Sequence, residues 1–265
     1  MRIVLHGGFH KTGTTSLQAG LEAHRPALAG RVLVQTLQLT PELARATEAA
    51  RAFSLRPDAG LLQTAMADWV AGLPDPAAHD LAISSEDFAG HMPGRFGVPD
   101  YRAAVATIPA AVQALRGRFP GAEVTVLMTL RAAEPWLKSL HWQLSIHPEL
   151  MLKQRRFCKE FAAAAAFEAV TGPLAQALAG AAVLRLASLE GLTLRRLGPV
   201  EAVYDALDLP DTLRASLRAL PRRNARAAEG LADQFVTLNR AKLAPAELRR
   251  AKSAMQAVMQ ALEAE

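Results

Sequence analysis

The first thirty residues contain a short apolar run, two glycines and then a helical pattern of leucines. Residues 2–6 (Arg-Ile-Val-Leu-His) predict a buried strand, which Gly7-Gly8 ends. Leucines at positions 17, 21 and 28 then recur at the spacing of one helix face, and Pro26 is expected to break that helix. This strand–turn–helix unit is the strongest constraint on the fold, because parallel strands need such crossover helices.

Further short apolar runs are spaced along the chain like the strands of one sheet. They lie at residues 31–35, 81–84, 124–130 and 182–186, separated by Ala- and Leu-rich stretches long enough for helices. This alternation predicts an α/β fold with a central parallel sheet covered on both faces. Residues 225–264 are nearly all helix formers, and Pro245 is expected to open a second helix there. We expect one domain, 1–265, with a helical C-terminal segment at about 225–265.

Composition excludes several classes of protein. With 51% hydrophobic and 21% charged residues among 265, the chain can bury a core, which excludes wholesale disorder. The net charge of +5 favours an anionic partner without specifying one. Aromatic residues make up only 5% of the chain, which argues against stacking on bases and therefore against a nucleic-acid partner.

The cysteine count and the apolar runs bear on location. The chain has a single cysteine, Cys158, so an intramolecular disulfide and a cysteine zinc site are both excluded. The N-terminal apolar stretch is too short for a signal peptide, and no run reaches the roughly 18–20 residues of a membrane span. We expect a cytoplasmic protein with no membrane span.

The turn after the first strand contains a near match to a phosphate-binding loop. Gly8-Phe9-His10-Lys11-Thr12-Gly13-Thr14-Thr15 differs from G-x-x-x-x-G-K-[ST] because Thr14 stands where the lysine is usual. The lysine is instead inside the loop, at Lys11. Backbone N–H groups at such a helix start hold anions, so we favour an anion site over an ordinary glycine turn with an exposed lysine.

A second candidate site follows the run at 124–130. That strand places Arg131 at its carboxyl end, where open α/β sheets bind ligands. A helix is expected to start near Glu134, which puts Ser139 about one turn inside it, able to face Arg131. A guanidinium and a hydroxyl suit a terminal phosphate, but the spacing fits equally well an arginine paired with Glu134 or Asp87.

The loop sequence resembles that of a known family. His10-Lys11-Thr12-Gly13-Thr14-Thr15-Ser16-Leu17-Gln18 is similar to the 5′-phosphosulfate loop of sulfotransferases that use 3′-phosphoadenosine 5′-phosphosulfate (PAPS), particularly the bacterial branch. The resemblance implies a P-loop-type three-layer sandwich with a central parallel sheet, a helical C-terminal part and no metal. It implies cofactor binding by His10, Lys11, Thr12, Gly13, Thr14, Thr15 and Ser16, with Lys11 neutralising charge on the transferred group.

The same resemblance extends to later segments. It implies that Arg131 and Ser139 hold the 3′-phosphate, although residues 132–135 are Ala-Ala-Glu-Pro where the family often has Asp-Pro directly after the arginine. It also implies that Arg222 and Arg223 belong to a basic segment that closes over that phosphate. Some family members stack a tryptophan on adenine directly after the Thr-Thr pair, and here that position is Ser16.

Two carboxylates, Glu86 and Asp87, end the run at 81–84 and allow two chemistries. In a nucleoside triphosphatase an acid at this point holds Mg²⁺. In a sulfotransferase this strand end resembles the place of the catalytic base, and Glu86 is our candidate, with Asp87 as the reserve. His91 and His10 are alternative bases, and a solvated strand end is the structural alternative. The remaining histidines lack metal-ligand spacing, so no metal site is expected.

The function implied is transfer of a sulfuryl group from PAPS to an acceptor hydroxyl or amine on a carbohydrate or other small molecule, with 3′,5′-ADP as product. Two alternatives stay open: a small-molecule kinase or other nucleoside triphosphatase with a P-loop, and a non-catalytic nucleotide-binding protein. The first is disfavoured by the missing lysine after Gly13. Homodimer formation through the C-terminal helices would suit the second.

Overall fold

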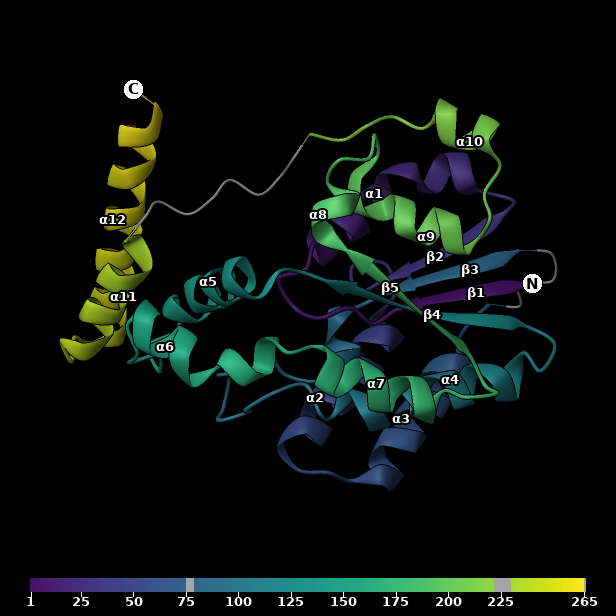
Figure 1. The fold of residues 1–265 in the computed structure, drawn as a ribbon, viewed down its shortest axis with the longest axis horizontal. Helices are drawn as coiled ribbons and strands as arrows, with labels where there is room; N and C mark the ends of the chain where they lie inside the picture. Colours follow the sequence, from purple (N-terminus) through teal and green to yellow (C-terminus); the bar gives the residue numbers. More distant parts are fainter. Residues whose placement is uncertain (75–78, 222–229, 265) are drawn as a thin grey trace. The chain divides into compact units, whose positions relative to one another are not determined.

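A five-stranded, all-parallel sheet forms the centre of the structure, a computed structural model that describes residues 1–74, 79–221 and 230–264. The strands are β1 (Arg2–His6), β2 (Val32–Thr36), β3 (Asp80–Ser84), β4 (Glu123–Leu130) and β5 (Val183–Ser188), in the spatial order β2-β3-β1-β4-β5 (Figure 1). Each predicted apolar run is one of these strands to within a few residues. The expected α/β fold with a parallel sheet is therefore confirmed.

Helices cover both faces of the sheet, as the βαβ alternation requires. One layer holds α1 (Thr14–Leu28), α8 (Leu189–Leu192), η3 (Gly198–Val200), α9 (Glu201–Ala206) and α10 (Asp211–Ser216). The other holds α2 (Pro41–Leu55), α3 (Ala59–Ala71), η1 (Glu86–Ala89), α4 (Ala104–Arg118) and α7 (Glu168–Ala177). Figure 1 shows these two layers on opposite sides of the strands, which gives the expected three-layer sandwich.

Helix α1 packs its apolar stripe on the sheet. Leu17, Leu21 and Leu28 are fully buried, as predicted, in one cluster with Val200 and Tyr204. The expected break at Pro26 is wrong, because α1 continues to Leu28. A proline removes only its own N–H bond to the carbonyl four residues earlier, and so close to the helix end that loss affects a single turn.

The chain divides into two compact units. The first comprises residues 1–131 and 166–221 and contains the sheet, and the second comprises residues 132–165 and 222–265. The described helices of the second are α5 (Ala133–Ser145), α6 (Gln154–Glu160), η2 (Ala162–Ala165), α11 (Leu231–Arg240) and α12 (Pro245–Ala264). Helix α12 begins at Pro245, as predicted. A single domain over 1–265 stays a prediction.

Two buried polar side chains hold the end of α5 within the second unit. Lys252 Nζ donates to the carbonyls of Ser145 and Ile146, at 2.8 and 2.9 Å. Asn239 Nδ2 donates to the carbonyls of His147 and Leu150, at 2.9 and 2.8 Å. The last carbonyls of a helix have no partners within it, so these donors replace water there.

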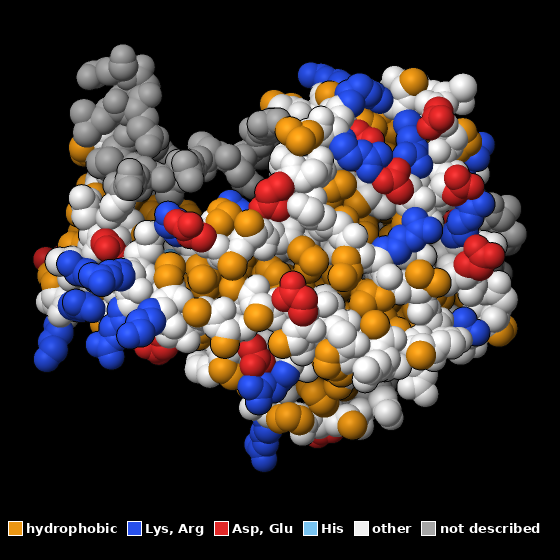
Figure 2. Space-filling model, in the orientation of Figure 1, with side chains coloured by type: hydrophobic (Ala, Val, Ile, Leu, Met, Phe, Trp, Pro, Cys, Tyr) orange, Lys and Arg blue, Asp and Glu red, His pale blue; other side chains and the backbone are white. Residues whose placement is uncertain are grey.

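The positive charge of the chain is unevenly divided between the units. The second unit holds 13 of the 30 Lys and Arg residues and 8 of the 25 Asp and Glu residues, so it carries the whole net charge of +5. Figure 2 shows Lys and Arg side chains gathered over α6, where Lys153, Arg155, Arg156 and Lys159 are exposed. The unit with the sheet is formally neutral.

Among the described residues, none of the helices combines the length and the apolar character that a membrane span requires.

Candidate anion-binding and catalytic site

The candidate site lies at the carboxyl ends of three neighbouring strands. Strand β1 leads through the glycine loop into α1 on one face of the sheet, whereas its neighbour β3 leads into η1 and α4 on the other. Adjacent strands whose connections diverge in this way leave a crevice at their carboxyl ends, the usual ligand position in open α/β sheets. Strand β4, on the other side of β1, ends directly before Arg131.

The loop between β1 and α1 has the backbone of a helix-terminal anion site. Gly13 is the N-cap of α1 with φ +98°, a left-handed conformation that glycine adopts without strain. Its carbonyl accepts from the N–H groups of Ser16 and Leu17, both at 3.1 Å. Lys11 also has a positive φ, +67°. A lysine in this region costs about 1 kcal/mol or more, and such strain is concentrated at functional sites.

The predicted loop residues differ in what their side chains can reach. The Thr14 hydroxyl, in the first turn of α1, is buried and has no hydrogen-bond partner among the described residues. A buried hydroxyl without a partner is costly, and a phosphate oxygen at the helix start would pair with it. The Thr12 hydroxyl instead donates to the carbonyl of Phe9 at 2.5 Å. Thr15 is exposed and Ser16 half-buried.

Lys11, Arg131 and Glu86 interact electrostatically. The pKa of Lys11 is lowered from its ordinary value chiefly by burial and then by the charge of Arg131, while Glu86 opposes both effects. Arg131 Nη1 also donates to the Lys11 carbonyl at 3.2 Å. The structure therefore brings together the predicted loop cation, the predicted strand-end arginine and the predicted base. Two adjacent cations and a helix start favour an anion at this point.

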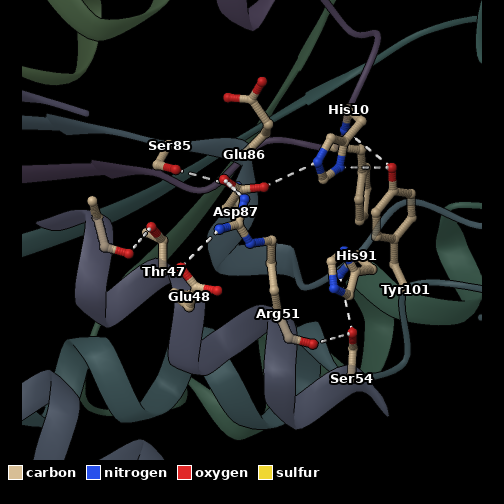
Figure 3. Close-up of polar contacts among 12 residues, drawn as sticks. His10, Thr47, Glu48, Arg51, Ser54, Ser85, Glu86, Asp87, His91 and Tyr101 are labelled. Carbon is tan, nitrogen blue, oxygen red and sulfur yellow. Dashed lines mark hydrogen bonds and ion pairs between the residues drawn. The ribbon is translucent and has the colours of Figure 1, made fainter. Parts of the chain in front are cut away.

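Glu86 lies at the start of η1 and is half-buried. Gln18 Nε2, one turn beyond Thr14 on α1, donates to Glu86 Oε2 and to the Ser84 carbonyl, both at 3.2 Å. In Figure 3 the Glu86 carboxylate points away from the polar cluster around Asp87. Glu86 and Asp87 are adjacent in the sequence, but their side chains therefore lie in different surroundings.

Asp87 is buried within an ion-pair cluster. Its Oδ1 lies 3.2 Å from His10 Nε2 and its Oδ2 lies 3.1 Å from Arg51 Nη1 of α2. Burial alone would raise the pKa of Asp87, but the His10 hydrogen bond and the charges of His10, Arg51 and His91 together lower it. Asp87 is therefore a stable carboxylate committed to its partners, which makes it a poor proton acceptor for a substrate.

His10 is buried with both ring nitrogens near polar partners. Besides the contact with Asp87, its Nδ1 lies 3.2 Å from the Tyr101 hydroxyl, which also accepts from the His10 backbone N–H at 3.1 Å (Figure 3). The preceding residue, Phe9, packs between the rings of Tyr101 and Phe167. Through Asp87, His10 thus connects the loop to the helical layer that contains α2, η1 and α4.

His91, the other alternative base, is half-buried beside the same cluster. Its backbone N–H donates to Ser54 Oγ at 3.1 Å. Burial foremost, and then the charge of Arg51, lower the pKa of His91. It belongs to the surroundings of Asp87 (Figure 3).

The remaining predicted site residues lie elsewhere in the chain. Ser139 is half-buried on α5 of the second unit, and Arg222 and Arg223 lie outside the described residues. The acids proposed as alternative partners of Arg131 have other cations: Asp87 pairs with Arg51, and Glu134 with Lys138 at 2.7 Å. No group of three or more metal-ligating His, Cys, Asp or Glu side chains occurs among the described residues.

Sequence analysis missed three residues that contact the predicted site residues: Gln18, Arg51 and Tyr101. Gln18 could have been found, because it lies four residues after Thr14 on the same helix face. Arg51 and Tyr101 come from a distant helix and a long loop, and nothing in their local sequence marks them.

No protein-family model matches the chain, and no curated protein sequence matches it. Among solved structures, the chain is similar to the crystal structure of a sulfotransferase from Alicyclobacillus acidocaldarius. The TM-score is 0.48 at 12% identity, over 91% of this chain and 93% of that chain. A likeness this slight does not define a family for the chain, so the functional argument rests on the site itself.

Proposed function

We propose that this chain is a sulfotransferase that moves a sulfuryl group from PAPS to a hydroxyl or amine of a carbohydrate or other small-molecule acceptor. One observation carries the proposal: the loop cation Lys11 lies with Arg131 and Glu86 at a helix start where threonine replaces the usual lysine. This arrangement offers an anion site, a charge-neutralising ammonium and a carboxylate base at one edge of the sheet.

The loop and the first turn of α1 supply the donors for a 5′-phosphate. The N–H groups at the start of a helix have no partners within the helix, and the helix dipole favours negative charge there. Residues 11–16 are the predicted source of these N–H groups, although the Ser16 N–H already donates to the Gly13 carbonyl, so residues 11–15 are the better candidates. The buried Thr14 hydroxyl, which has no partner among the described residues, would gain one. Thr12, whose hydroxyl is engaged with Phe9, would contribute only through its backbone N–H.

Sulfuryl transfer needs charge neutralisation at the leaving group and a base at the acceptor. The acceptor oxygen or nitrogen attacks sulfur, the bond between sulfur and the bridging oxygen breaks, and the electron pair stays on the phosphate of 3′,5′-ADP. Lys11 would neutralise that developing charge, and Glu86 would take the acceptor proton. Gln18 holds the Glu86 carboxylate, so its second oxygen can face the acceptor.

Arg131 would bind the 3′-phosphate, because a guanidinium can donate to two phosphate oxygens at once. Ser139, Arg222 and Arg223 stay predictions as further ligands of that phosphate. A cytoplasmic location stays a prediction too.

A nucleoside triphosphatase is less well supported. The lysine that reaches the β- and γ-phosphates is missing after Gly13. Of the two acids at the end of β3, Asp87 is already paired with His10 and Arg51, and Glu86 accepts from Gln18.

The test is a transfer assay with labelled PAPS and a panel of saccharide, phenolic, amine and lipid acceptors. We expect label transfer to one acceptor class by the wild-type chain, and loss of transfer in Glu86→Gln. Glu42→Gln is the matched control, since Glu42 is an acid on α2 whose ion pair within the described part of the chain is with the exposed Arg45. No transfer to any acceptor by the wild type, or full turnover in Glu86→Gln, would contradict the proposal as stated.

A further inference from the structure

We propose that His6, at the end of β1, is a positioning residue that fixes the conformation of the phosphate loop through a one-directional chain of hydrogen bonds. The chain runs from Ser84 through His6, Thr129 and Thr12 to the carbonyl of Phe9. Its effect on cofactor binding rests on the function proposed above, whereas its existence does not.

The chain joins the ends of three adjacent strands to the loop. Ser84 Oγ, the last residue of β3, lies 2.8 Å from His6 Nδ1. His6 Nε2 lies 3.1 Å from Thr129 Oγ1 of β4, which lies 2.7 Å from Thr12 Oγ1 in the loop. Thr12 Oγ1 lies 2.5 Å from the Phe9 carbonyl oxygen. Ser84, His6, Thr129 and Thr12 are all buried.

The last link fixes the direction of every other link. A carbonyl oxygen only accepts, so the single hydroxyl proton of Thr12 goes to Phe9. Thr12 Oγ1 must then accept from Thr129, which spends the single hydroxyl proton of Thr129. Thr129 Oγ1 must in turn accept from His6, so His6 carries a proton on Nε2.

The protonation of the other nitrogen follows from burial. Desolvation lowers the pKa of His6 to about 3, so the ring is neutral at ordinary pH and Nδ1 is unprotonated. Nδ1 therefore accepts from the hydroxyl of Ser84. In a charged ring Nδ1 would also carry a proton and donate, so the Ser84 hydroxyl could no longer donate to it.

Gly8 shows how tightly the loop is packed on this chain. A β-carbon at Gly8 would lie 2.5 Å from both His6 Nε2 and Thr129 Oγ1. The loop backbone therefore passes directly over the hydrogen bond between these side chains. A glycine is required here by the approach of the backbone to His6, in a loop whose conformation determines where its N–H groups point.

The functional consequence concerns preorganisation. Hydrogen-bond donors contribute most to anion binding when they are already oriented, since no reorganisation then opposes binding. The His6 side chain is fully buried and both of its ring nitrogens are engaged, with Ser84 and Thr129, so it acts on the loop through Thr129 and Thr12. It is a positioning residue and not a candidate base.

The first test is the tautomer of His6, measured in the wild-type protein by ¹⁵N NMR of the histidine ring nitrogens. We expect a protonated Nε2 and an unprotonated Nδ1, unchanged between about pH 5.5 and 8 because the folded pKa lies far lower. A proton on Nδ1, or a ring that titrates in this range, would overturn the proposal without any reference to ligand binding.

The second test interrupts the chain at Thr129. Thr129→Val removes the hydroxyl at nearly constant volume, and Thr129→Ser retains it. Thr125→Val is the matched control, because Thr125 lies four residues earlier on the same strand and takes no part in this series of hydrogen bonds. In Thr129→Val we expect faster hydrogen exchange of the amides of residues 7–13 and about tenfold weaker binding of 3′,5′-ADP, the effect of about 1.4 kcal/mol. Thr129→Ser and Thr125→Val should match the wild type in both measurements.

The two readouts separate the two proposals. If the wild type fails to bind 3′,5′-ADP, the proposed function is contradicted, and loop exchange still decides the role of His6. Exchange in Thr129→Val equal to that of the wild type would overturn the positioning role. If Thr129→Val does not fold, Thr129→Ser must still show wild-type exchange and the wild-type His6 tautomer, and failure of either would overturn it.

Discussion

The buried, neutral His6 predicts a measurable dependence of stability on pH. Burial lowers its pKa from 6.5 to about 3 in the folded protein. Between these two values the unfolded chain binds a proton that the folded chain does not, so stability falls as pH falls through this window. At about pH 5, some 1.5 units below the unfolded pKa, the contribution of His6 is a loss of about 2 kcal/mol, at 1.36 kcal/mol per unit.

The assay is urea unfolding followed by circular dichroism at about pH 7.5 and pH 5, with wild type and His6→Gln. We expect the stability difference between the two pH values to be about 2 kcal/mol smaller in the variant. His91→Gln is the control that should keep most of the wild-type dependence, and Asp87 does not interfere because its lowered pKa acts only below about pH 4. An unchanged pH dependence in His6→Gln would refute the assignment of a buried neutral ring.

The remaining predictions concern packing, a helix cap and catalysis. Gly20→Ala should destabilise the protein by about 1–2 kcal/mol in urea unfolding, because the new β-carbon would lie 2.8 Å from Val200 Cβ and this outweighs the gain in helix propensity. Gly117→Ala, at a helical glycine with open space around it, should instead stabilise the protein by up to about 1 kcal/mol. Equal changes in the stability of these two variants would contradict the close packing of Gly20 on Val200. Lys252→Met should cost about 2–3 kcal/mol and speed amide exchange at the end of α5, since two carbonyls lose their charged donor; slow exchange there would contradict the cap. Glu86→Gln should abolish sulfuryl transfer while leaving 3′,5′-ADP affinity within about twofold, and weaker binding would show that Glu86 belongs to the nucleotide site.

The fold could be predicted largely because four of its five strands, β1 to β4, are mostly buried. Such strands appear in the sequence as short continuous apolar runs, and their alternation with helix-forming stretches indicated a parallel arrangement. The continuation of α1 beyond Pro26 could not be predicted, since it depends on tertiary packing of Leu28 that local propensity does not contain. The division of the chain into two discontinuous units was also invisible, because no linker composition marks the boundaries at 131 and 165.

The candidate site could be predicted where one strand end or one loop carries it. Lys11, Glu86 and Arg131 each follow a recognisable strand, and the carboxyl ends of parallel strands meet at one edge. The difference between Glu86 and Asp87 could not be predicted in this way. It depends on His10, Arg51 and Tyr101, which come from separate parts of the chain. The role of His6 could not be predicted either, because it follows from proton directions that only the side-chain geometry defines.

The distribution of charge between the two units bears on the proposed nucleotide site. The overall surplus of positive charge belongs to the second unit, and the unit that contains the loop is formally neutral. Within the sheet-containing unit, the groups that would attract the proposed anion are Lys11, Arg131 and the start of α1. Binding there should therefore depend on these groups individually more than on the bulk charge of the protein.

The central claim is that the loop and Arg131 form a metal-independent site for the nucleotide of PAPS. The most direct test is isothermal titration calorimetry of the wild-type chain with 3′,5′-ADP in the presence of EDTA. A separate titration with Mg·ATP, without EDTA, tests the alternative ligand. The variant Lys11→Met is titrated with 3′,5′-ADP to test the loop lysine. We expect tight binding of 3′,5′-ADP without Mg²⁺, weaker binding of Mg·ATP, and at least tenfold weaker binding of 3′,5′-ADP by Lys11→Met. Preference for Mg·ATP, or no binding of 3′,5′-ADP at all, would contradict it.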